Sequence, residues 1–199
     1  VIEFVTVAAE FCAFLERAES MKRSTFVDTT LKILPLLYLK ASMLPKCEMI
    51  GDESPETYVT EEIYEVLRIN LASILAEKDD YLEVFLPDMA YSDEPIKKNI
   101  SEDLADIYQD IKDFIFVFQL GLNETMNDSL AICQENFGLL WGQKLVNTMR
   151  ALHDVKYSPK ARGEDEEEEE YEPQNNEDCH CEDDDCHCHD HGCHCHDDE

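Results

Sequence analysis

Lysine and arginine are scarce in this chain of 199 residues, which has 16 of them against 46 aspartates and glutamates and a formal net charge of −30 at pH 7. Nucleic-acid binding depends on clustered basic side chains that neutralise phosphates, so this scarcity argues against a nucleic-acid partner. The same charge disfavours an anionic membrane surface. Metal cations and basic protein surfaces are the partners that such a field attracts.

Long apolar runs are also missing. The longest is the seven residues from Ile33 to Leu39, whereas a membrane-spanning helix needs about 20. The N-terminal stretch VIEFVTVAAEFCAFLE has no basic leader, and Glu3 and Glu10 interrupt it, unlike a secretion signal. We therefore expect a cytoplasmic protein with no membrane partner. The chain also has no phosphate-cradling glycine loop and no GxSxG elbow.

Alternating strand patterns are absent, and apolar residues recur instead at helical spacing. The pattern predicts helices at residues 1–19, 24–44, 56–77, 102–120 and 124–153. These predict an all-α fold, a bundle of about five to six helices over residues 1–157. The segment ILPLLYL is apolar on every side, so we expect its helix at the centre of the bundle, kinked at Pro35. The stretch DDYLEVFLPD is ambiguous, and we interpret it as a short helical turn.

Several residues predict how the helices begin, end and pack. Ser24 and Ser101 are suited to cap the second and fourth helices, and Gly121 to close the fourth. Gly138 and Gly142, four residues apart in the fifth helix, would let another helix approach closely.

The chain changes character after the last helix. Residues 159–199 hold 18 acidic residues against Lys160 and Arg162, which leaves 28 acids and 14 bases for residues 1–158. The segment GEDEEEEEYEPQNNED has no aliphatic residue to bury, so we expect residues 158–178 to be a disordered acidic linker. The Cys/His-rich tail at residues 179–199 follows it.

The tail repeats the triplet Cys-His-Cys at 179–181, 186–188 and 193–195, a spacing of seven. A coiled-coil seam is excluded because the other positions offer no apolar stripe. Disulfide scaffolds spread their cysteines through a small core, and this segment has none. Metal ligation fits better. The candidate ligands are Cys179, His180, Cys181, Cys186, His187, Cys188, His189, His191, Cys193, His194, Cys195 and His196.

These ligands would fill about two tetrahedral sites. Four thiolates of the first two triplets are one grouping, and Cys193 and Cys195 with two of the nearby histidines are another, although other divisions suit the sequence equally. Thiolate with imidazole favours zinc, with nickel or copper as alternatives. The competing interpretation is a protein-interaction module whose acidic tail has no role of its own.

Two acidic motifs suggest a third interpretation. EEIYE, with Glu61, Glu62 and Glu65, resembles the EExxE signature of all-α nucleotide pyrophosphatases, which bind magnesium through helix-borne carboxylates. Asp103, Asp106, Asp110 and Asp113 form a stripe on a later helix. The glutamates lie away from the apolar face and the aspartates beside it, so a solvated acidic surface is the better interpretation.

The remaining reactive residues have simpler interpretations. Cys12 and Cys133 lie on apolar helix faces and are expected in the core, while Cys47 lies in a loop without a nearby histidine. His153 lies at the predicted end of the fifth helix, where the helix dipole favours a cation. Trp141 is expected in the core.

The stretches IEFVTVAAEFCAFLE and TLKILPLLYLKASMLP resemble those of an uncharacterised helical family of Bacteroides-type bacteria, known only as a domain of unknown function. The resemblance covers about residues 1–155 and leaves out the Cys/His tail. It implies a cytoplasmic, all-helical protein, and it implies neither an activity nor any functional residue.

Overall fold

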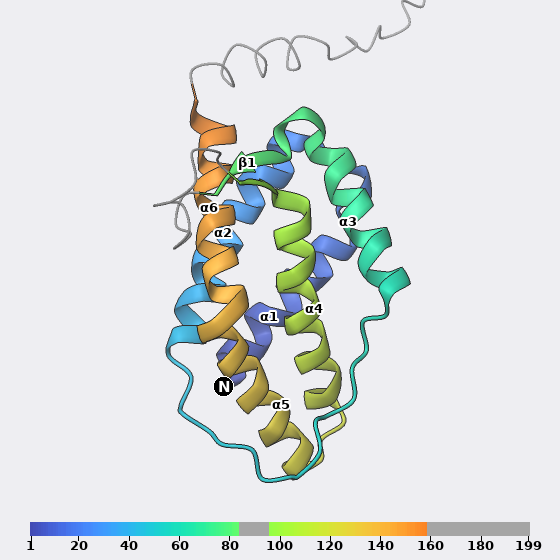
Figure 1. The fold of residues 1–199 in the computed structure, drawn as a ribbon, viewed down its shortest axis with the longest axis vertical. Helices are drawn as coiled ribbons and strands as arrows, with labels where there is room; N and C mark the ends of the chain where they lie inside the picture. Colours follow the sequence, from blue (N-terminus) through green and yellow to red (C-terminus); the bar gives the residue numbers. More distant parts are fainter. Residues whose placement is uncertain (84–95, 159–199) are drawn as a thin grey trace, which may run out of the picture.

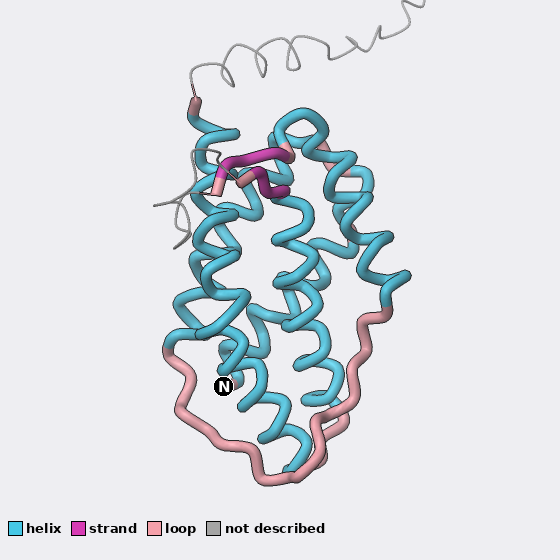
Figure 2. Tube along the Cα trace, in the orientation of Figure 1, coloured by secondary structure: helices cyan, strands magenta, loops and turns pink. Residues whose placement is uncertain are grey.

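The computed structural model describes residues 1–83 and 96–158, and they form a helical bundle with a small two-stranded sheet (Figures 1 and 2). The all-α prediction is confirmed. The elements are α1 (Ile2–Glu16), α2 (Arg23–Ser42), α3 (Glu61–Leu75), β1 (Asp80–Leu82), β2 (Lys97–Asn99), α4 (Ile100–Gln119), α5 (Asn123–Asn136), a π-helical segment (Phe137–Trp141) and α6 (Gly142–Tyr157), together with two short 3-10 helices, η1 (Ala18–Ser20) and η2 (Ala76–Lys78). Among these described helices, none has the length and apolar character to cross a bilayer.

Helix α4 lies at the centre of the bundle, where α1, α3, α5 and α6 all pack on it. Its predicted apolar stripe is confirmed, because Leu104, Ile107 and Ile111 are fully buried and Phe114 nearly so. Burying a large apolar side chain contributes about 1.5–3 kcal/mol, so this stripe is a main source of stability.

The prediction that the second helix is central was wrong. Helix α2 packs on α1 and α6 and buries Leu34 and Leu37, but Leu36 is 44% exposed and Leu39 is 51% exposed. It continues as one α-helix through Pro35. An apolar surface on every side does not decide which helix is surrounded, because that depends on where the other helices pack.

The two serine caps were predicted wrongly. Helix α2 begins at Arg23 and α4 at Ile100, so Ser24 and Ser101 each lie inside a first turn. At α4 the cap is Asp79, whose side chain accepts hydrogen bonds from the Ser101 backbone N–H at 2.7 Å and the Ser101 hydroxyl at 2.6 Å. The Asp79 carbonyl also accepts the Ile100 N–H at 2.8 Å. The cap therefore comes from a distant part of the chain.

The predicted helical turn at DDYLEVFLPD was also wrong where the structure describes it. Residues 80–82 form β1, which pairs antiparallel with β2, with Asp80 opposite Asn99 and Leu82 opposite Lys97. Residues 84–88 lie outside the described part.

Helix α3 begins at Glu61 rather than near residue 56, where the sequence predicted it to begin. The Thr60 hydroxyl accepts a hydrogen bond from the Ile63 N–H at 3.3 Å and caps the helix there.

A long connection, residues 43–60, runs from α2 around the end of the bundle and up beside α4 (Figure 2). Side chains of the helices hold it. Asp128 on α5 accepts the N–H groups of Ile50 and Gly51 at 2.7 and 2.8 Å, and Asp113 on α4 accepts those of Tyr58 and Val59 at 2.7 and 2.8 Å. These aspartates satisfy backbone donors that have no strand or helix partner.

The predicted fifth helix is interrupted by the π-helical segment between α5 and α6. Gly121, at φ 73°, ends α4 as predicted. The expectation that Gly138 and Gly142 admit another helix was wrong. A Cβ at Gly142 would lie 2.3 Å from the Phe137 carbonyl oxygen of the same helix, whereas one at Gly138 would meet nothing within 4 Å. Gly142 is therefore needed by the π turn itself.

Substituting the two glycines tests this assignment. Gly142→Ala should lower the free energy of unfolding by about 1–3 kcal/mol, because the new methyl group forces the π turn to shift. Gly138→Ala is the matched control and should raise it by up to about 1 kcal/mol through helix propensity. Urea unfolding followed by circular dichroism measures both. Equal effects of the two substitutions would contradict the assignment.

Candidate functional site

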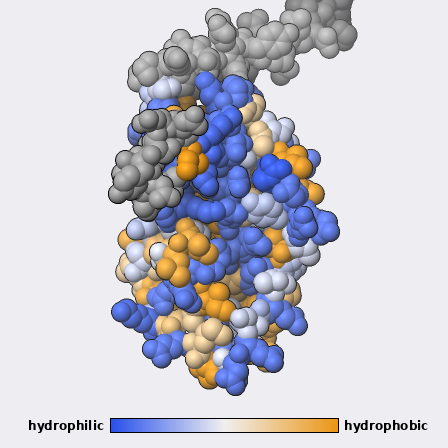
Figure 3. Space-filling model, in the orientation of Figure 1, coloured by the Kyte–Doolittle hydropathy of each residue, from blue (hydrophilic) through white to orange (hydrophobic). Residues whose placement is uncertain are grey.

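The twelve predicted metal ligands of the tail, Cys179 to His196, lie outside the described residues. Their grouping therefore stays a prediction. Within the described part, the chemically richest feature is a cavity of about 410 Å³ between α4, the α5–π–α6 helix and the connection at Pro55, Glu56 and Thr57. In the view of Figure 3, hydrophilic residues run down the middle of the bundle, with hydrophobic residues on both flanks.

One wall of the cavity is polar and acidic. Helix α4 provides Asp106, Asp110 and Asp113, and the facing helix provides Asn136 and Lys144. The expectation of a solvated aspartate stripe was wrong. Asp103 is only 4% exposed, and the other three aspartates are half-buried. Since neighbouring helices surround α4, even the residues beside its apolar face are partly covered.

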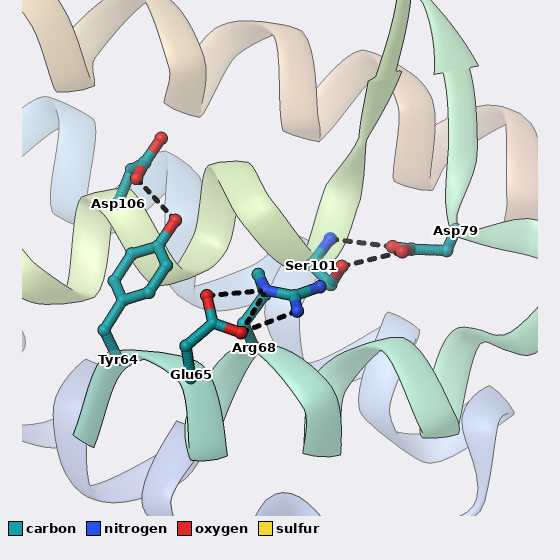
Figure 4. A network of polar contacts seen from close by, with 6 residues as sticks. All are labelled: Tyr64, Glu65, Arg68, Asp79, Ser101 and Asp106. Carbon is teal, nitrogen blue, oxygen red and sulfur yellow. Dashed lines mark hydrogen bonds and ion pairs between the residues drawn. The ribbon is translucent and has the colours of Figure 1, made fainter. Parts of the chain in front are cut away.

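Each aspartate of the wall is held by a neighbour. Asp106 accepts a hydrogen bond from the Tyr64 hydroxyl of α3 at 2.8 Å (Figure 4) and forms an ion pair with Lys144. Asp110 accepts one from the Asn136 amide at 2.6 Å. Asp113 holds the backbone of the connection, as described above. The carboxylates thus tie α4 to α3, α5, α6 and the connection after α2.

Burial raises the pKa of Asp110 and of Asp113 above the ordinary value. At Asp110 the charges of Asp113 and Asp106 raise the pKa further, while the Asn136 hydrogen bond opposes the shift. Burial also raises the pKa of Asp103 to about 6, against a hydrogen bond from Tyr81. A positive charge in this cavity would relieve the repulsion among the carboxylates.

The other wall is apolar. Phe114 and Val117 come from α4, Ile132 from α5, and Trp141 from the π-helical segment. Trp141 is fully buried, and its indole N–H donates to the Cys133 carbonyl at 3.1 Å. Sequence reasoning placed Trp141 in the core but missed its place in a cavity, along with Asn136 and Lys144. The π segment that brings these residues opposite the aspartates has no signature that we recognised in the sequence.

The glutamates of EEIYE do not join this cavity. Glu61 and Glu62 are exposed, as predicted, and the half-buried Glu65 pairs with Arg68 of the same helix at 2.7 Å (Figure 4). In the part of the chain that the structure describes, no three histidine, cysteine or acidic side chains are placed to hold a metal ion. A magnesium site that unites the two motifs therefore finds no support there.

The three cysteines and the one histidine of the described residues lie in the surroundings that the sequence predicted. Cys12 and Cys133 are buried, as predicted, and burial raises the pKa of both thiols well above the ordinary value. Cys47 is half-buried beside Gln134, which accepts its backbone N–H at 3.3 Å. His153 is exposed, and its ring lies 4.6 Å from that of Tyr157 in the last turn of α6.

Residues 1–158 match a family described as Domain of unknown function (DUF5063). The chain belongs to this family. A Bacteroides fragilis protein of known crystal structure is 91% identical in sequence to this chain. The match covers 81% of this chain and 95% of that chain, and the two structures superpose with a TM-score of 0.72. No curated protein matches significantly. The resemblance inferred from the sequence is thus confirmed. The DUF5063 description names no activity, so function has to be argued from the residues.

Asp103→Asn tests the burial of the acidic stripe. The folded protein holds a proton on Asp103 up to about pH 6, whereas an unfolded aspartate releases it near pH 3.9. Wild-type stability should therefore fall relative to the variant as pH rises from about 4 to 6, by about 1–2 kcal/mol. Urea unfolding at several pH values measures the difference. Parallel curves for wild type and Asp103→Asn would contradict the assignment.

Proposed function

We propose that this DUF5063 protein is a cytoplasmic soft-metal-binding protein that stores or delivers zinc, or alternatively nickel or copper, through residues 179–199. The three registered Cys-His-Cys triplets carry the proposal. Cysteines two positions apart bring both sulfurs to one ion when a flexible chain bends, and two such pairs complete a tetrahedron.

The proposed chemistry gives a first site of four thiolates, from Cys179, Cys181, Cys186 and Cys188. In a second site, Cys193 and Cys195 are joined by two nearby histidines. The surrounding carboxylates concentrate cations and accept hydrogen bonds from ligating imidazoles. They also disfavour ionisation of the thiols, so metal binding should release protons and weaken as pH falls.

For the helical domain we propose a binding role rather than catalysis. Its cavity carboxylates each hold a structural contact, and its two core thiols are sealed from solvent. A protein partner is favoured by apolar side chains exposed directly after α2 and on the π segment. Met43 is 67% exposed and Leu139 is 71% exposed, and a ring contact of 5.2 Å between Tyr38 and Phe137 brings the two segments together.

The magnesium-dependent nucleotide pyrophosphatase remains the enzymatic alternative. It would use Glu61, Glu62 and Glu65 with the aspartate stripe. Magnesium-dependent turnover of a nucleoside triphosphate that Glu62→Ala abolishes would establish this alternative in place of a binding role for the domain.

Metal content decides the proposal for the tail. The full chain, purified anaerobically from its native host, should carry about two zinc, nickel or copper ions by mass spectrometry. A chain that ends at Tyr157 should carry none. The matched control replaces the six tail cysteines by serine and keeps every acid, and it should lose the metal too. Metal retained by the serine variant would assign binding to the histidines or carboxylates in place of the thiolates, and an empty full chain would refute soft-metal binding.

A further inference from the structure

We infer that the cavity between α4 and the α5–π–α6 helix binds a small organic cation, a primary ammonium or guanidinium group on a short aliphatic body. This site is separate from the tail and does not depend on the metal-binding proposal. Four observations carry the inference: the volume of the cavity, its free carboxylate oxygens, its apolar wall and the π-helical segment that shapes it.

The cavity has the size of a ligand site. Its volume of about 410 Å³ falls within the range of about 300–1,000 Å³ that small-molecule sites occupy. A π-helical turn inside an α-helix is rare and is frequently found at functional sites. Here it interrupts the helix that forms one side of the cavity, and Trp141 lines the cavity at its last residue.

The polar wall matches a donor with a positive charge. In the described part of the chain, the hydrogen bonds that reach Asp110 and Asp113 all end on Oδ1, so Oδ2 of each carboxylate remains to accept from a ligand. The two residues are three positions apart on α4, a rise of about 4.5 Å along the axis, which one ammonium or guanidinium group can bridge. Lys144 already places an ammonium group against Asp106. The ammonium group of Lys144 is thus a cation of the proposed kind that the protein itself places on this wall.

The apolar wall favours an organic cation over an inorganic ion. Magnesium and calcium require about six to eight oxygen ligands around one point, and the described residues offer no group of three acidic, histidine or cysteine side chains placed for a metal. The exposed Leu140 and the half-buried Ile132 instead offer a surface for an alkyl chain, and the buried Phe114, Val117 and Trp141 also line the cavity.

Trp141 provides the readout because it is the single tryptophan of the chain. The probe is hexylammonium, titrated into the full chain while the fluorescence of Trp141 is followed. Hexanol and hexanoate are matched neutral and anionic probes with the same alkyl chain. Binding to the acidic tail leaves this signal unchanged, because Trp141 is buried in the helical domain. We expect a saturable change with hexylammonium, and about tenfold weaker responses with hexanol and hexanoate.

Asp110→Asn should weaken hexylammonium binding about tenfold or more, because it removes one charge and keeps the shape of the side chain. Glu102→Gln removes an exposed charge from the same helix outside the cavity and should leave the affinity unchanged. Circular dichroism verifies that both variants are folded. If Asp110→Asn does not fold, the three probes on the unaltered chain still decide the inference.

The inference is overturned if Trp141 does not respond to hexylammonium. Equal responses to all three probes would also overturn it, since the cavity would then bind alkyl chains without regard to charge. So would equal weakening by Asp110→Asn and Glu102→Gln, since the attraction would then come from the overall negative field. Selective, saturable binding of hexylammonium that depends on Asp110 supports it.

Discussion

The packing of α4 against four other helices is the constraint on which the rest of the domain depends. Eleven of its 20 residues are buried. Its apolar stripe forms the core, and its aspartates must be satisfied by protein groups rather than by solvent. Asp103, Asp106, Asp110 and Asp113 accordingly receive hydrogen bonds from Tyr81, Tyr64, Asn136 and the backbone at residues 58–59. The central helix thus organises both the core and the polar contacts around it.

The acidic residues of the helical domain and those of the tail differ in their surroundings. In the helical domain several of them accept hydrogen bonds from backbone N–H groups that no helix or strand satisfies. Asp79 caps α4 in this way, and Asp113 and Asp128 hold the long connection after α2. Their partial burial raises the pKa of Asp103, Asp110 and Asp113, a cost that their hydrogen bonds offset in part. In the tail, by contrast, the acids surround a dense set of thiols and imidazoles, where we propose that they concentrate metal ions.

The π-helical segment connects α5 to α6 and also contributes to the lining of the cavity. Its extra residue per turn requires glycine at position 142, because a side chain there would meet the Phe137 carbonyl. The same segment brings Trp141 into the core and, with α6, places Lys144 opposite Asp106. One local departure from α-helical geometry therefore adds Trp141 to the apolar wall of the cavity and precedes the helix that carries Lys144 on its polar wall.

The sequence by itself determined the helices, the apolar stripe of α4, the buried Cys12 and Cys133, the turn at Gly121 and the family, because helical periodicity and a glycine at positive φ are local properties. The metal ligation that we propose for the tail likewise rests on residue type and spacing in the sequence. Only the tertiary structure decided that α4 rather than α2 is central and that Asp79 rather than Ser101 caps α4. The half-buried aspartates opposite Asn136 and Lys144 were decided in the same way. Such features depend on contacts between residues far apart in the chain, and periodicity along one helix does not specify which face another helix will cover.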